Sequence, residues 1–465
     1  MRARLKVKLL RWKNKFLAGT KRQRLLKARL LRSQRRIEAL EAEVARLKQL
    51  TEPIPVANHV YPAQLIALAV FIVTHANGSL RCASKTVGFV SRMMGWNYES
   101  PSHVTVRRWV LRCGLYLLDH AKDKVGEYAG IIDESIQIGR EKMLLFLGVR
   151  IAKDRSHCTP LTMDDVEVLG VEVQQSWTGE DVAQFIKERL AHHSQITMKY
   201  MISDRGSNLL KALVSLGITA VSDCTHGMMN VVKSLFDNDE ALSQLAAQIG
   251  QFRSQYALTD KGFLLPCSLR DKDRFLRIFT IVEWAQRIDG YWKKLTTEQR
   301  GVLDFLSQAR PLIRTLGQVK TLVAIASQVL KSAGLSEHSH RLWEQKVAQF
   351  RKGKRLTSQA KSFIEAIDQY FDQHQELILL HQRLLCCSDV IESAFAYYKN
   401  KGGTAVISAD VLGLTLYKQH LTSDFVVTAM TTVSRKDVEI WEQRYTCDNR
   451  YSLLKRMNRE LKSAA

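Results

Sequence analysis

The sequence predicts an α/β protein in which a mixed β-sheet is interrupted by a large all-helical insertion and preceded by helical segments. Five strand-like runs of apolar or alternating residues lie in the middle of the chain, at residues 128–139, 142–152, 164–175, 198–204 and 219–226. Helical patterns separate the last three runs, so the order is β-β-β-α-β-α-β and the sheet has to be mixed. From about residue 227 to residue 385 the pattern is helical almost throughout.

The same patterns divide the chain into six segments. Apolar residues at heptad spacing from Leu26 to Leu47 predict a short coiled coil, with a solitary solvated helix as the alternative. Pro53, Pro55 and Pro62 then predict a stiff linker that ends the helix. The predicted segments are a basic arm and coiled-coil helix (1–50), a helix-turn-helix-like DNA-binding domain (51–128), a catalytic core (129–238), a helical insertion (239–383), the second part of the core (384–420) and C-terminal helices (421–465).

The charge of the chain indicates a polyanionic partner. The formal net charge is +23, and residues 1–50 contain 17 Lys or Arg against 3 Glu. The longest apolar run, about residues 63–73, is too short to span a bilayer, so no membrane association is expected. The eight cysteines include no CxxC pair, which favours reduced thiols in a cytoplasmic protein.

Residues 62–120 are predicted to form several helices that bind DNA. Its last helix, in "SPSHVTVRRWVLRCG", begins with a serine cap and carries Arg107, Arg108 and Arg112 around apolar positions. A helix of this kind suits helix-turn-helix docking, in which its start meets base edges and phosphates. An ordinary three-helix bundle with a basic face is the alternative.

Three acidic residues are candidate metal ligands. Asp133 lies within the first strand-like run, and Asp204 ends the fourth. If the first and fourth strands are neighbours, these carboxylates lie close together and repel unless a cation such as Mg²⁺ or Mn²⁺ separates them. Glu392, in the helical stretch "LLCCSDVIESAFAYYKNKGG", is the natural third ligand, and Lys399 lies two turns further on. The alternatives are a helix cap for Asp204 and a weakly paired amphipathic helix for Glu392.

The element order, the three acids and the helical insertion resemble the ribonuclease-H-like catalytic domain of DDE transposases. "VIESAFAYYK" resembles the Glu-bearing helix of bacterial insertion-sequence transposases, in which a Lys seven residues after the Glu contacts transposon-end DNA. "SDCTHGMMN", with Asp223 and His226, is similar to the DxxH motif that precedes the helical insertion of hAT transposases.

This resemblance implies a nucleoid-associated enzyme that cleaves double-stranded DNA at the ends of an element and transfers the strands. Asp133, Asp204 and Glu392 would hold two Mg²⁺ or Mn²⁺ ions, His226 would orient the scissile phosphate, and Lys399 would contact DNA. Such an enzyme holds two DNA ends together and is therefore expected to be a homodimer or higher oligomer. The rival interpretations are a structure-selective nuclease of the same fold and a domesticated, inactive DNA-binding regulator. Three tryptophans in the insertion are expected in its core rather than stacked on a displaced base: Trp284, Trp292 and Trp343.

Overall fold

A computed structural model describes residues 2–120, 124–136, 140–151, 160–266, 274–381, 383–400 and 406–463. Its centre is a five-stranded mixed sheet made of β1 (Gly126–Ile136), β2 (Lys142–Arg150), β3 (Glu167–Gln174), β4 (Ile196–Ser203) and β5 (Ala220–Ser222). The strand order is β3-β2-β1-β4-β5, in which β2 runs antiparallel to its neighbours β1 and β3, and β1, β4 and β5 run parallel. The α/β class and the order of elements are therefore as predicted, and β1 and β4 are neighbours, which is the condition for Asp133 and Asp204 to lie close together. The fifth strand is shorter than the predicted run 219–226, because the chain becomes helical at Cys224.

Both faces of the sheet are covered, as expected for a sheet with parallel strands. One face packs against α5 (Gly179–His192) and α6 (Ser207–Ser215), with Phe146 and Ile132 at its centre. A capping box between Thr178 and Asp181 stabilises the start of α5, the helix that follows β3. The opposite face, which includes Ile131 and Leu145, packs against α16 (Asp389–Lys399) and merges with the core of the insertion.

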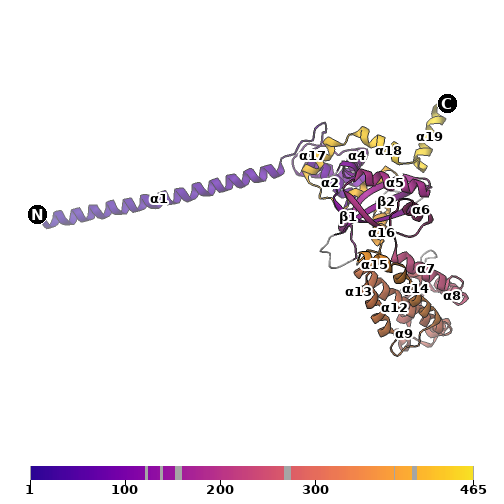
Figure 1. Cartoon of the computed structure of the whole chain (residues 1–465). Coiled ribbons are helices and arrows are strands. Elements are labelled where there is room, and N and C mark those ends of the chain that lie inside the picture. The colour runs from indigo at the N-terminus through magenta and orange to yellow at the C-terminus, as the bar shows by residue number, and fades with distance from the viewer. Residues whose placement is uncertain are drawn as a thin grey trace.

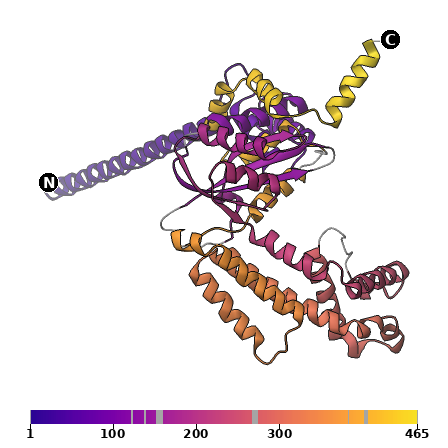
Figure 2. The same cartoon turned by 45° about the vertical axis from the view of Figure 1, so that its right-hand side comes forward.

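The helical insertion extends from one end of the sheet (Figure 2). Its helices are α7 (Cys224–Phe236), α8 (Glu240–Tyr256), α9 (Arg274–Tyr291), α10 (Thr297–Gly301), α11 (Phe305–Gln308), α12 (Arg310–Ala333), α13 (Glu337–Arg351), α14 (Ser358–Gln373) and α15 (Gln375–His381). Trp284 and Trp343 are buried here and donate hydrogen bonds to the Leu264 carbonyl and the Asp368 carboxylate, at 2.7 Å each. Both tryptophans are core residues, as predicted.

The N-terminal and C-terminal helices form one unit beside the sheet. The elements concerned are α2 (Ala63–Thr74), α3 (Leu80–Met93), α4 (His103–Leu115), the π-helix η1 (Tyr116–His120), the 3-10 helix η5 (Ala409–Leu416), α17 (Ser423–Thr432) and α18 (Arg435–Tyr445). The last helix, α19 (Arg450–Ser463), projects from the body of the protein (Figure 1). Trp109 and Val110 of α4 share a buried cluster with Val426 and Met430 of α17. The helices predicted as a separate domain at 51–128 therefore need α17 to complete their core, a contact that local sequence periodicity does not reveal.

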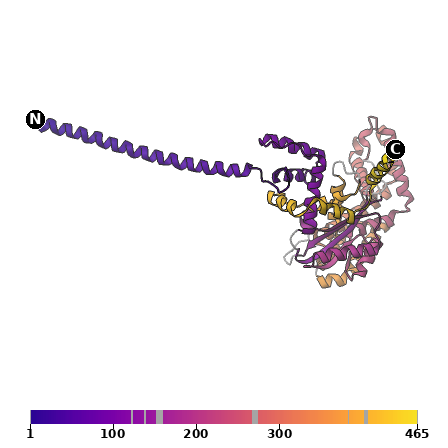
Figure 3. The same cartoon turned by 90° about the horizontal axis from the view of Figure 1, so that it is seen from above.

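The first helix, α1 (Arg2–Thr51), projects from the body of the protein as a single long rod (Figures 1 and 3). Leu26, Leu30, Ile37 and Leu40 of the predicted heptad are all more than half exposed. An apolar stripe of this spacing matches a coiled-coil seam that is left uncovered by the described residues of the chain. Among the described residues, none of the helices combines the length and apolar character that crossing a bilayer requires.

Candidate active site

Strand β1 places Asp133 near its C-terminal end, on the sheet face that is covered by α16. The side chain is only 7% exposed, and its Oδ1 accepts a hydrogen bond from the backbone N–H of Glu134 at 2.7 Å. A carboxylate this deep in a protein is costly to keep ionised unless cationic or hydrogen-bonding groups surround it. The position of Asp133 therefore needs an explanation beyond packing.

Strand β4 places Asp204 beside Asp133. The two strands are parallel with Ile131 opposite Ile202, so continuing the register by two residues brings the two aspartates to the same level. Arg205 adopts a left-handed backbone conformation (φ +66°), and the N–H of Gly206 donates to Asp204 Oδ1 at 2.8 Å. This tight turn holds the carboxylate at the sheet edge before α6 begins.

Glu392 completes the group from a distant part of the chain. It lies on α16, which packs against β1, and its side chain is exposed while its neighbours Ile391 and Phe395 are buried. The negative charges of Asp204 and Glu392 both act on the Asp133 carboxylate. Burial, followed by these charges, raises the pKa of Asp133 to about 7, although His226 acts in the opposite direction. The four residues predicted from sequence thus influence one another in a single region.

Asp223 and His226 form a fixed pair at the start of α7. Asp223 Oδ2 accepts hydrogen bonds from the backbone N–H of His226 at 2.7 Å and from its Nδ1 at 2.8 Å. The other oxygen, Oδ1, accepts from the N–H of Ser388 at 2.8 Å. The hydrogen bond to Asp223 is the main reason that the pKa of His226 rises to about 9, and the charges of Asp133 and Asp204 contribute. His226 is therefore an oriented cation at neutral pH, with Nδ1 facing Asp223.

Asp223 contributes more than the sequence indicates. Its side chain is buried and joins the end of β5 to the segment before α16 through Ser388. The DxxH spacing in the sequence signals the bond to His226, but not the contact with Ser388. Glu134, by contrast, bonds to Lys142 at 3.1 Å and to Asn208, so it belongs to a separate network.

Arg107 has protein partners instead of a free guanidinium. Its Nε donates to Asp410 Oδ1 at 2.8 Å, and NH2 lies 3.6 Å from Glu442 Oε1. These carboxylates come from η5 and α18, which cover this side of α4. These ion pairs hold α4 against η5 and α18, and the contact of Arg107 with DNA stays a prediction.

Arg112 is also committed to the fold. Its Nε donates to the Val433 carbonyl at 2.6 Å, and a second nitrogen donates to the Met430 carbonyl at the end of α17. This arrangement caps the end of α17, and the DNA contact of Arg112 stays a prediction. Arg108 is the member of the predicted trio whose side chain is exposed.

Lys399 is the last residue of α16, and its side chain is half-buried. Its ammonium lies 5.8 Å from the centre of the Phe395 ring, and it takes part in no ion pair with the part of the chain that the structure describes. Lys399 is seven residues from Glu392, or about 10 Å along a helix at about 1.5 Å per residue. It therefore presents a cation on the same helix as the candidate carboxylate.

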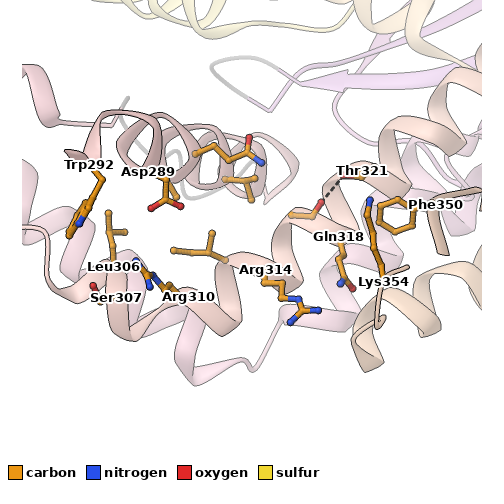
Figure 4. A pocket seen from close by; sticks show the side chains of 15 residues that line it. Asp289, Trp292, Leu306, Ser307, Arg310, Arg314, Gln318, Thr321, Phe350 and Lys354 are labelled. Carbon is orange, nitrogen blue, oxygen red and sulfur yellow. Dashed lines mark hydrogen bonds between the residues drawn. The ribbon is translucent and has the colours of Figure 1, made fainter. Parts of the chain in front are cut away.

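The insertion contains a cavity of about 510 Å³ that the sequence did not indicate (Figure 4). Trp292 lies at one end and Lys354 at the other, with Arg310 and Arg314 between them (Figure 4). Trp292 is half-buried, so the core position predicted for it is only partly realised. None of the candidate catalytic residues lines this cavity.

No known family model matches this sequence, and no curated protein matches it either. The interpretation of the site therefore depends on the geometry of the chain's own residues and on the resemblance of its motifs.

Proposed function

We propose that this protein is a DNA transposase with a ribonuclease-H-like core that cleaves element ends and joins them to target DNA by metal-dependent phosphoryl transfer. The observation that carries the proposal is the convergence of Asp133, Asp204 and Glu392 from β1, β4 and α16. The antiparallel β1–β3 meander, the parallel β4 and β5, and the helical insertion between β5 and α16 support the same class.

The donor set fits hard divalent cations. Asp133 is a buried carboxylate whose pKa is raised by burial and by two neighbouring carboxylates, and bound cations would remove this repulsion. Among the described residues, no group of three that includes Asp133 brings its ligand atoms within 4.8 Å of one another. Asp133 would contact both ions, and Asp204 and Glu392 would each hold one.

Two Mg²⁺ or Mn²⁺ ions in this site would activate the attacking oxygen and stabilise the leaving oxygen of an in-line displacement. His226 contributes a positive charge whose direction is set by Asp223, which suits binding of a non-bridging phosphate oxygen. Asp223 accepts hydrogen bonds from the backbone N–H groups of His226 and Ser388 and from Nδ1 of His226, so it positions His226.

DNA binding is assigned to cations outside the carboxylate group. The projecting helix α1 carries most of the net charge and would neutralise phosphates along the duplex. Lys399 and the exposed Arg108 would contact the backbone nearer the scissile bond. Pairing of two α1 helices through the exposed heptad would hold two DNA ends in one complex, as a homodimer or higher oligomer.

The experiment is to incubate the full-length protein with a duplex carrying the DNA that flanks its own gene, with Mg²⁺, and to size the products. The proposal predicts cleavage at defined ends and joined strand-transfer products. Asp204→Ala and Glu392→Ala should abolish both while retaining DNA binding, whereas the matched control Glu134→Gln should retain activity. Cleavage without joining would indicate a nuclease, and binding without cleavage would indicate an inactive regulator.

A further inference from the structure

Two distant segments of the chain meet at the junction between the sheet and the insertion. Cys224 follows Asp223 at the start of α7, whereas Cys386 and Cys387 lie in the extended segment before α16. The N–H of Cys224 donates to the Cys386 carbonyl at 2.7 Å, and Ser388 donates to Asp223 as described above. These backbone bonds fix the side chains of the two segments relative to one another.

We propose that Asp223, Cys224 and Cys387 form a binding site for one thiophilic divalent cation, of which Zn²⁺ fits best. Each residue brings one ligand atom to within 4.8 Å of the ligand atoms of the other two. Around one Zn²⁺ ion, Zn–S bonds of about 2.3 Å in tetrahedral geometry place two sulfurs about 3.7 Å apart. Small side-chain rotations would bring the three ligands to that separation.

The chemistry of the three ligands selects the ion. Thiolates are soft ligands that bind Zn²⁺ strongly and Mg²⁺ poorly, so this site differs in kind from the all-carboxylate group around Asp133. Binding releases the two thiol protons of Cys224 and Cys387 as the ion enters, which leaves the local charge unchanged. The thiol of Cys386 donates to the Leu330 carbonyl at 3.8 Å, so a water molecule would complete four-coordination.

One of the three ligands borders a small cavity. Cys224 and Asp223 are almost fully buried, while Cys387 is half-buried. A small cavity of about 40 Å³ lies against Cys387 and is also lined by Lys331 and Asp389. This volume exceeds the roughly 10–15 Å³ that one water molecule requires. Lys331 and Asp389 pair with each other, so the ammonium charge is offset by its own carboxylate.

A cation at this position would connect the two parts of the catalytic core. Cys224 follows β5 directly, and Cys387 lies just before the helix that carries Glu392. Joining them would fix α16 against the carboxyl ends of β4 and β5, where Asp204 lies. Zinc would act here by holding the fold together, as structural zinc sites do. The inference concerns metal binding alone and stands independently of the proposed DNA chemistry.

The test is the metal content of the full-length protein, purified from zinc-supplemented medium and dialysed against buffer with Mg²⁺. Elemental mass spectrometry should find about one zinc per chain. Cys224→Ser and Cys387→Ser should lower this content at least about tenfold. Cys82→Ser, which changes an exposed thiol outside the cluster, and Asp133→Asn should leave it unchanged.

A second measurement covers the case in which Cys224→Ser does not fold. Titrating zinc-free wild-type protein with Co²⁺ should give thiolate-to-cobalt charge-transfer absorption and the visible bands of a tetrahedral site. Cys387→Ser should weaken these signals, since one of the two thiolate ligands is lost. The proposal would be overturned if the purified wild-type protein contained no zinc and its Co²⁺ spectrum showed no thiolate absorption. Full retention of zinc by Cys387→Ser would also overturn it. The two proposals fail separately. A wild-type protein that cleaves DNA but binds no zinc would overturn only this inference, and one that binds zinc but does not cleave DNA would overturn only the proposed function.

Discussion

Replacing Asp133 by asparagine should stabilise the metal-free protein above neutral pH while destroying its cleavage activity. The pKa of Asp133 rises from 3.8 to about 7, mainly because of burial and then because of Asp204 and Glu392. One pKa unit corresponds to about 1.4 kcal/mol, so ionising this side chain costs the folded state about 4 kcal/mol. Burying an asparagine amide in its place costs about 2 kcal/mol, which leaves a net gain of about 2 kcal/mol.

The sign of the pH dependence follows from the raised pKa. Because Asp133 binds its proton more tightly when folded, its stabilising contribution is fully present below about pH 4. It is lost as the pH rises through about 7. In EDTA, Asp133→Asn should therefore unfold at a higher temperature than wild type at pH 8, with a much smaller advantage at pH 5.

Differential scanning calorimetry at the two pH values provides the measurement, with Glu134→Gln as the matched control. Adding Mg²⁺ at pH 8 should raise the unfolding temperature of wild type and leave that of Asp133→Asn unchanged, because a ligand stabilises only a state that binds it. An equal effect of the substitution at pH 5 and pH 8 would refute the electrostatic reasoning. A lower unfolding temperature for Asp133→Asn at pH 8 would refute it too.

Three further predictions concern the residues around this site. Lys399→Ala should reduce cleavage of end-containing DNA, with partial recovery at low salt and none with extra Mn²⁺; recovery by Mn²⁺ alone would place Lys399 at the metals. Deleting residues 1–50 should weaken DNA binding and flatten the plot of log affinity against log salt concentration in a binding titration. An unchanged slope would mean that α1 points away from DNA. Asp223→Asn should lower the pKa of His226 from about 9 towards 6.5 in an NMR titration assigned with His226→Gln; a value that stays near 9 would show that other groups set it.

Local sequence patterns were sufficient to predict the sheet. Alternation and apolar runs locate the strands, and the crossover helices imply parallel pairing, which brings Asp133 and Asp204 to neighbouring strands. The place of Glu392 beside them depended on a resemblance, because a helix after a long insertion can pack in many ways. In the structure α16 packs on β1.

Contacts between distant parts of the chain could not be predicted in this way. Arg107 on its helix has the appearance of a DNA-binding side chain, yet its partner Asp410 lies 303 residues later. The meeting of Cys224 with Cys387 is equally invisible in their spacing, since no CxxC pattern marks it. Such pairings follow from the packing of α4 and α16, and sequence periodicity carries no information about packing partners.

If Asp133, Asp204 and Glu392 form one metal site, iron-mediated cleavage of the polypeptide should reveal it. Fe²⁺ replaces Mg²⁺ in oxygen-ligand sites, and with ascorbate and peroxide it cuts the backbone near where it binds. We expect three cuts, one close to each of these residues, which Mg²⁺ suppresses and Asp204→Ala removes together. Cuts confined to one of the three segments, or cuts that persist in Asp204→Ala, would contradict a shared site.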